Sequence, residues 1–80
     1  MNVTVSGITK QMADEGAWIA RYKKGRAHTE FGEYYYLEQG TNYFTFDTHI
    51  VNGDWELRLF RRGTYVDEDI LSIVKFTIGN

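Results

Sequence analysis

Two tryptophan-led stretches set the architecture of this chain, Trp18-Ile19-Ala20-Arg21-Tyr22 and Trp55-Glu56-Leu57-Arg58-Leu59-Phe60. In each stretch large apolar residues recur at every second position, which is the period of a β-strand with one buried face. Aromatic segments rich in strand-forming residues lie between the two stretches. This arrangement indicates a core of paired strands rather than an active site.

Length and composition bound the class of protein. The chain has 80 residues, of which 42% are hydrophobic, 16% aromatic and 25% charged. These values are typical of a globular protein, so residues 1–80 are predicted to form a single domain. There is no cysteine, which excludes disulfides and thiolate metal sites and favours a reducing compartment. Since no signal peptide and no apolar run long enough for a membrane span is visible, we expect a cytoplasmic protein.

Strand-like segments recur at spacings near ten residues and are separated by polar or glycine-containing turns. The predicted strands span residues 2–6, 17–23, 33–38, 42–48, 55–62 and 70–78. Residues 10–16 are polar and break the alternation, which predicts a loop with at most one helical turn. Short strands without a convincing amphipathic helix predict an all-β fold, an immunoglobulin-like antiparallel β-sandwich of about six to seven strands.

The alternation also predicts which side chains point inward. We expect the Trp18, Ala20 and Tyr22 side chains to share one core with the apolar face of the second tryptophan stretch. The predicted core comprises Val3, Val5, Trp18, Ala20, Tyr22, Phe44, Phe46, Trp55, Leu57, Leu59, Val74, Phe76 and Ile78. On the reverse of the same strands, Arg21, Arg58 and Phe60 are expected to be accessible to a partner.

The two tryptophan stretches, with Tyr34-Tyr35-Tyr36 and Lys75-Phe76-Thr77-Ile78, resemble SKICH-type and related bacterial immunoglobulin-like domains over most of the chain. The chain departs from that pattern at Ala17, where the family has an acidic residue, and at Arg21, where it has an apolar one. Members tend to carry a further strand before the segment matching residues 3–5. The resemblance therefore implies a sandwich that lacks its first edge strand, and a role in protein or membrane recruitment. An open edge accepts strands from other chains, so homodimer formation by edge-strand pairing is one hypothesis.

The tyrosines suggest a binding surface. Since consecutive strand residues alternate between faces, Tyr34 and Tyr36 should share one side of their strand while Tyr35 takes the other. Together with Tyr43, the exposed rings would suit a sugar, a peptide or a protein surface. The alternative is that one side is core and the other a half-covered sheet face, because aromatic residues are common in strands.

Arginines suggest a second surface. Arg58 and Arg62, with Lys23, Lys24, Arg26 and Arg61, would form a positive patch if their strands are neighbours. An arginine there could bind an acidic protein or an anionic lipid head group, so peripheral membrane contact is an alternative. The competing interpretation is a solvated face balanced by nearby carboxylates. The net charge of -2 and the lack of a known motif argue against nucleic acid.

Residue patterns for catalysis or metal binding are weak. Asp67-Glu68-Asp69 lacks the order and the distal glutamate of a calcium loop. Of the two histidines, His28 has no partner at metal-ligand spacing, and His49 has only Asp47, which is weak evidence for a pair. No serine or cysteine stands in a nucleophile motif. We therefore expect no enzyme activity and no cofactor. The sequence favours a noncatalytic protein–protein interaction module, an adaptor or small inhibitor of an unknown protein partner, and the alternative is a domain that binds carbohydrate or anionic lipid head groups. The candidate partner-binding residues are Tyr34, Tyr35, Tyr36, Tyr43, Arg21, Arg58, Phe60 and Arg62.

Overall fold

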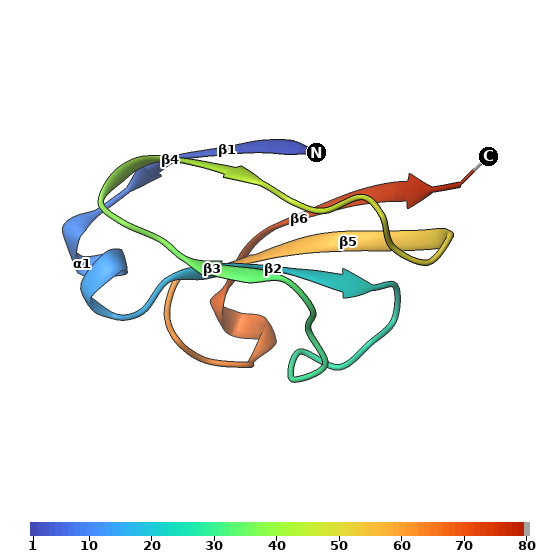
Figure 1. The fold of residues 1–80 in the computed structure, drawn as a ribbon. Helices are drawn as coiled ribbons and strands as arrows, with labels where there is room; N and C mark the ends of the chain where they lie inside the picture. The colour runs from blue at the N-terminus through green and yellow to red at the C-terminus, as the bar shows by residue number, and fades with distance from the viewer. Residues whose placement is uncertain (80) are drawn as a thin grey trace.

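The computed structural model describes residues 1–79, and the chain is mostly β-structure arranged in two antiparallel sheets (Figure 1). A two-stranded sheet has the order β1-β4, and a four-stranded sheet has the order β3-β2-β5-β6. The strands are β1 (Asn2–Ile8), β2 (Trp18–Lys23), β3 (Tyr34–Tyr36), β4 (Gly40–Thr45), β5 (Gly53–Phe60) and β6 (Ile70–Ile78). The all-β prediction is confirmed.

The six predicted strands all exist, and five of them have shifted ends. The prediction for 70–78 matches β6, whereas β5 begins two residues earlier than predicted and ends at Phe60. The predicted helical turn is α1 (Lys10–Asp14), which the Thr9 hydroxyl caps by accepting a hydrogen bond from the Met12 amide. A one-turn helix η1 (Asp67–Asp69) precedes β6. Strand propensity therefore located the elements, although it did not fix their ends.

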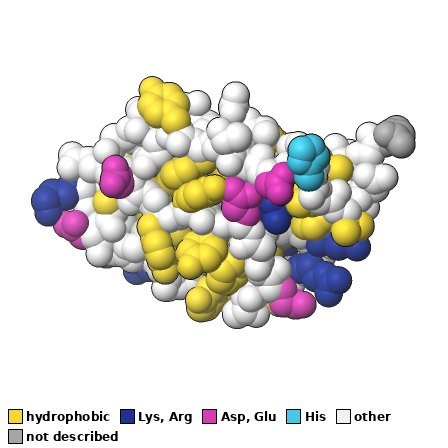
Figure 2. Space-filling view, in the orientation of Figure 1, with side chains coloured by type: hydrophobic (Ala, Val, Ile, Leu, Met, Phe, Trp, Pro, Cys, Tyr) yellow, Lys and Arg dark blue, Asp and Glu magenta, His cyan; other side chains and the backbone are white. Residues whose placement is uncertain are grey.

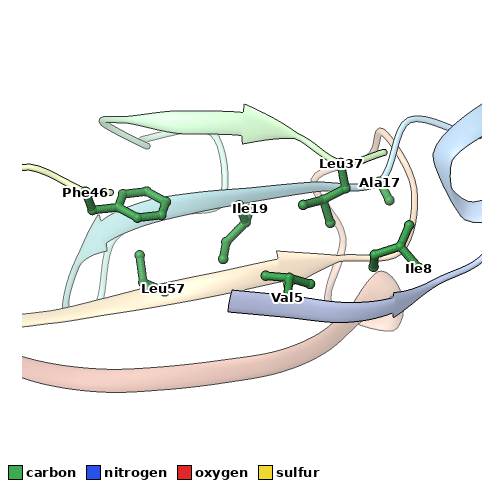
Figure 3. Close-up of a cluster of buried hydrophobic side chains, with 7 residues drawn as sticks. All are labelled: Val5, Ile8, Ala17, Ile19, Leu37, Phe46 and Leu57. Atoms are coloured by element: carbon green, nitrogen blue, oxygen red, sulfur yellow. The ribbon is translucent and has the colours of Figure 1, made fainter. Parts of the chain in front are cut away.

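One face of the four-stranded sheet packs against β1 and β4, which Figure 1 shows as a separate layer. The buried side chains between the two sheets are mostly aliphatic (Figure 3). They are Val5, Ile8, Ala17, Ile19, Leu37, Phe46 and Leu57. Because β2 and β5 each send alternate residues to this side, Ile19 and Leu57 both belong to this first cluster.

The opposite face of the same sheet holds a second cluster, which is aromatic. Trp18, Ala20, Tyr22 and Phe60 are buried there, with Phe31 and Ile70 packed against them. In Figure 1 the loop between β2 and β3 and the loop between β5 and β6 run beneath this face. Both faces of β2 are therefore buried, and loops rather than a third sheet cover the second face.

The strand register corrects the predicted core. Trp18 lies opposite Phe60, and Ile19 lies opposite Leu59. Directly opposite residues of an antiparallel pair point to the same face, so Trp18 shares a side with Phe60 and not with Leu57. The expectation that Trp18, Ala20 and Tyr22 join Leu57 in one core is wrong.

Burial follows the same pattern along the rest of the predicted core. Val5, Trp18, Ala20, Tyr22, Phe46 and Leu57 are buried as expected. Six other predicted members are half-buried, namely Val3, Phe44, Trp55, Leu59, Phe76 and Ile78. Val74 is exposed, and its assignment to the core is wrong. The reason is that β6 is an edge strand, so its side chains are less covered than those of the inner strands β2 and β5.

Candidate functional site

Strand β3 presents its tyrosines to two different environments. Tyr36 pairs with Trp18 and Tyr34 with Ala20, so these two rings lie on the aromatic side of the sheet. Tyr35 points to the other side, where it stacks on Phe44 with ring centroids 4.7 Å apart. The predicted alternation of the three tyrosines agrees with this register. Tyr34 and Tyr36 are exposed, whereas Tyr35 is half-buried between the sheets.

Tyr34 and Tyr36 border a surface cavity of about 150 Å³, named here the aromatic pocket. Its lining residues are Trp18, Phe31, Tyr34, Tyr36, Gly63 and Tyr65. Figure 2 shows hydrophobic side chains gathered on the lower middle of this face, in the region of β3 and the loops below it. No lining residue is charged, and five of the six are aromatic.

The rings of the aromatic pocket hold one another in place. Phe31 and Tyr65 approach Trp18 edge-on, with centroids 5.0 Å and 5.7 Å from it. Behind Trp18, Phe60 stacks on the indole at 4.6 Å with an interplanar angle of 10°. Both kinds of ring contact are favourable because the negative face of one ring meets the positive edge of another or stacks with an offset. The floor of the pocket is therefore fixed by the buried cluster.

The loop after β5 supplies Tyr65 and is tied down by one carboxylate. Asp69 accepts hydrogen bonds from the Thr64 hydroxyl at 2.5 Å and from Arg61 Nε at 3.0 Å. The Thr64 hydrogen bond, above all, and the two nearby arginines hold the pKa of Asp69 below its usual range. Trp18 Nε1 donates to the Thr64 carbonyl at 3.3 Å. The position of this loop thus depends on an ionised Asp69.

A close backbone approach also fixes this loop. The Gly63 amide donates to the Glu15 carbonyl at 2.9 Å. At Gly16, where φ is +87°, an added Cβ would lie 3.3 Å from the Gly63 nitrogen. A side chain at residue 16 would therefore be strained and would crowd Gly63, on the wall of the aromatic pocket.

Arg58, on the loop-covered face of β5, holds the loop between β2 and β3 in place. Its guanidinium lies over the Tyr22 ring, 3.9 Å from the centroid, and its Nε donates to Glu56 Oε1 at 2.7 Å. It also donates to the Arg26 carbonyl at 2.9 Å and to His28 Nδ1 at 2.7 Å. Since an arginine can only donate, His28 Nδ1 is the acceptor, and His28 Nε2 pairs with Asp67.

Two predicted partner-binding residues are consequently buried. Arg58 is 4% exposed and Phe60 is 0% exposed, so the expectation that they face outward is wrong. Alternation assigned them to the reverse of the strand, which is their true side. What it did not show is that two loops fold over that side. The same burial raises the pKa of Tyr22 to about 12, since the phenolate is poorly solvated.

Arg21 and Arg62 also have carboxylate partners. Arg21 Nη1 donates to Glu33 Oε1 at 3.1 Å, and Arg62 Nε lies 3.4 Å from Asp69 Oδ1. Burial alone would raise the pKa of Glu33, but hydrogen bonds from the Tyr35 hydroxyl and the Asp47 amide, together with the Arg21 charge, lower it overall. The Glu33 hydrogen bond in turn raises the pKa of Tyr35. These arginines are therefore neutralised locally.

The structure brings together only part of the predicted site. Tyr34 and Tyr36 meet at the aromatic pocket, while Tyr43 lies on β4 opposite Thr4 and outside the lining. Sequence reasoning missed Phe31 and Tyr65 because they lie outside the predicted strands, in the connections between them. A large aromatic residue in such a loop is itself a signal, since it must either pack against the core or remain exposed for binding.

The comparisons with known proteins return no relative of this chain. No protein-family model matches it, and neither a curated protein nor a solved structure is similar enough to count as a match. Within residues 1–79 no three His, Asp or Glu side chains gather as metal ligands. None of the helices in that part of the chain is long and apolar enough to cross a membrane. The interpretation of function therefore depends on the aromatic pocket itself.

Proposed function

We propose that this chain is a noncatalytic protein–protein interaction module whose aromatic pocket receives a proline-rich segment of a partner protein. The observation that carries the proposal is an uncharged, ring-lined cavity of about 150 Å³ at the protein surface. Ligand pockets are typically lined by apolar and aromatic groups with a few polar atoms that set orientation. Tyrosine and tryptophan are also the residues most often responsible for binding energy at protein interfaces.

The polar atoms at the rim favour an extended proline-rich segment. Among residues 1–79, the hydroxyls of Tyr34, Tyr36 and Tyr65 donate no hydrogen bond to another protein group, so they are free to donate to a ligand. A polyproline II helix has no internal hydrogen bonds, and its carbonyl groups are open acceptors. Such segments dock in aromatic-lined grooves, because little conformational entropy is lost on binding.

The proposal extends to the fold class. Two antiparallel sheets that enclose an aliphatic cluster are consistent with an open immunoglobulin-like sandwich. The resemblance to SKICH-type domains supports the same class, and its implied role in recruitment agrees with a docking module.

Carbohydrate is the second candidate ligand. Exposed tyrosine rings with free hydroxyls in an uncharged pocket also suit a sugar ring, which has apolar faces and many hydroxyl groups. An anionic lipid head group has less support, because the aromatic pocket lining contains no cation. Arg58, which was expected to bind such a group, is instead paired with Glu56.

The test is a calorimetric titration with two defined probes, a decaproline peptide and a neutral oligosaccharide such as chitotetraose. We expect the peptide to bind and to change tryptophan fluorescence, since Trp18 lines the pocket. Tyr36→Ala should weaken binding about 10-fold or more, the effect of losing a binding hot spot. Tyr43→Ala is the matched control, since Tyr43 is as exposed as Tyr36 (76% against 67%) but lies elsewhere.

Three results would contradict the proposal. Binding of the oligosaccharide alone, with the same dependence on Tyr36, would replace the protein ligand by a carbohydrate. If neither probe binds the folded protein, the aromatic pocket is not the binding site. The same conclusion follows if the two tyrosine variants lose affinity equally.

A further inference from the structure

Strand β6 forms a long free edge of the four-stranded sheet. Within residues 1–79, β6 pairs with β5 alone, so its other side offers unpaired backbone donors and acceptors. It is nine residues long, whereas β3 at the opposite edge has three. The pairing of β1 with β4 is irregular between Val5 and Ile8. The longest strand of the protein is thus also an edge.

This edge lacks most of the features that prevent strands from pairing between molecules. Proteins usually protect an edge with proline, several charges or a central bulge. The chain has no proline, and Lys75 is the only charged residue within Ile70–Ile78. Pairing with β5 is regular from Ile78 to Ser72, and the one irregularity lies near Ile70. The central part of β6 is therefore a regular template.

The exposed apolar side chains of β6 lie on both faces of the sheet. Val74 lies opposite Leu57 and points to the side of β1, whereas Ile73 lies opposite Arg58 and points to the other side. Both are exposed. A partner packed on one face would cover only one of them. A strand lying beside β6 would contact both, so the shape of this surface fits a strand.

We propose that the strand is β6 of a second copy, paired antiparallel about a two-fold axis at Val74. Val74 is the midpoint of Ile70–Ile78, so this register pairs the regular residues 72–76 of the two copies with one another. Val74 then faces Val74 of the second copy, and Ser72 faces Phe76. Such an isologous contact closes with two copies and yields a dimer.

Charge selects this register. Centred on Val74, each Lys75 lies opposite Ile73 of the second copy, where its stem packs on an apolar side chain and its ammonium stays in water. Centred on Lys75, the two ammonium groups would lie directly opposite each other, which is destabilising. The contact between two edge strands buries less surface than a standard stable interface, so we expect dimerisation to depend on protein concentration.

The first test is sedimentation equilibrium over a range of protein concentrations. We expect the average mass to rise from monomer to dimer as the concentration increases. Val74→Lys should abolish the rise by placing two charges opposite each other on the two-fold axis. Val51→Lys is the matched control, because Val51 is also exposed (67% against 55% for Val74) and lies outside β6. A wild-type protein that stays monomeric at every concentration would overturn the proposal.

The second test is cross-linking, which reads the register directly because the chain has no cysteine. Opposite residues in antiparallel strands have Cα atoms about 4.5–5.5 Å apart, within reach of a disulfide. Val74→Cys should therefore oxidise to a linked dimer at least ~10-fold faster than Ile73→Cys, whose copies lie diagonally about 7–8 Å apart. Equal rates, or faster linking of Ile73→Cys, would reject the register. The aromatic pocket is at the opposite edge of this sheet, so either proposal can fail without the other.

Discussion

The two faces of the four-stranded sheet are buried in different ways. One face meets another sheet across a mostly aliphatic cluster, and Ile19 and Leu57 are typical of it. The other face is covered by two loops and is aromatic, with Arg58, Glu56 and Asp69 buried or paired beneath it. A neighbouring sheet covers the first face with the alternate side chains of its two strands, whereas the loops over the second face are held by ring contacts and by hydrogen bonds to Arg58 and Asp69. The aromatic pocket lies on the loop-covered face.

The two tryptophans give the largest expected contrast between the faces. Trp18→Ala should lower the free energy of unfolding by about 3–5 kcal/mol, because it removes the ring that Phe60, Phe31 and Tyr65 all contact. Trp55→Ala should cost less, about 1–2 kcal/mol, since Trp55 is only half-buried, on the sheet-covered face near the start of β5. Urea denaturation of both variants measures the difference.

Equal losses of unfolding free energy in the two variants would contradict the prediction that Trp18 stabilises the protein more than Trp55 does. A further check is the near-ultraviolet circular dichroism of the Trp55 variant. It should keep the aromatic signal of the second cluster, because Trp18 and Phe60 remain stacked.

The buried ion pair on the loop-covered face gives the next effect. Arg58→Ala should cost about 3 kcal/mol or more, because it leaves the Glu56 carboxylate buried without its partner and frees the loop that carries His28. Lys10→Ala breaks an exposed pair with Asp14 and should cost less than about 1 kcal/mol. Chemical denaturation of each variant measures both values.

A double variant separates charge from packing at this position. If the cost of Arg58→Ala comes from the unpaired carboxylate, adding Glu56→Ala should cost much less than it does in the wild-type background. Strictly additive costs would show that Arg58 acts through its contacts with Tyr22, Arg26 and His28 and not through Glu56.

Acid should weaken the loop-covered face through Asp69. The pKa of Asp69 is lower in the folded protein than in the unfolded chain, so the unfolded state binds more protons as the pH falls. The stabilisation is complete above the ordinary carboxyl pKa of about 4 and is lost as the pH falls toward the folded pKa. Asp69→Asn should therefore be less stable at neutral pH and show a flatter loss of stability as the pH falls below about 5.

The Trp18 indole hydrogen provides a local measurement of the same effect, since it is donated to the Thr64 carbonyl in this loop. Its exchange with solvent should accelerate on acidification in the wild type and be fast at every pH in Asp69→Asn. Glu33→Gln is the comparison, because the pKa of the Glu33 carboxyl is also lowered but this side chain lies away from the loop. A wild-type acid response that persists unchanged in Asp69→Asn would reject the role of this carboxylate.

Several features of the molecule were accessible from the sequence. The alternation in residues 18–22 and 55–60 located β2 and β5, and the apolar run at the end of the chain located β6. Tyr34 and Tyr36 were correctly placed on one side of their strand, with Tyr35 on the other. These results depend only on the period of a strand and on the residues that favour it, which are local properties.

The tertiary structure alone decided which faces were joined and which were covered. Alternation divides the residues of each strand into two sets, but it does not say which set of β2 adjoins which set of β5. The pairing of Trp18 with Phe60 settles that choice and places Arg58 under the loops instead of in solvent. The same is true of the aromatic pocket, since Trp18, Phe31 and Tyr65 are distant in sequence and meet only when two loops fold beneath the sheet. Register and loop packing arise from contacts between distant residues, whereas strand formation arises from neighbours, and so the sequence by itself determined the strands but not the site.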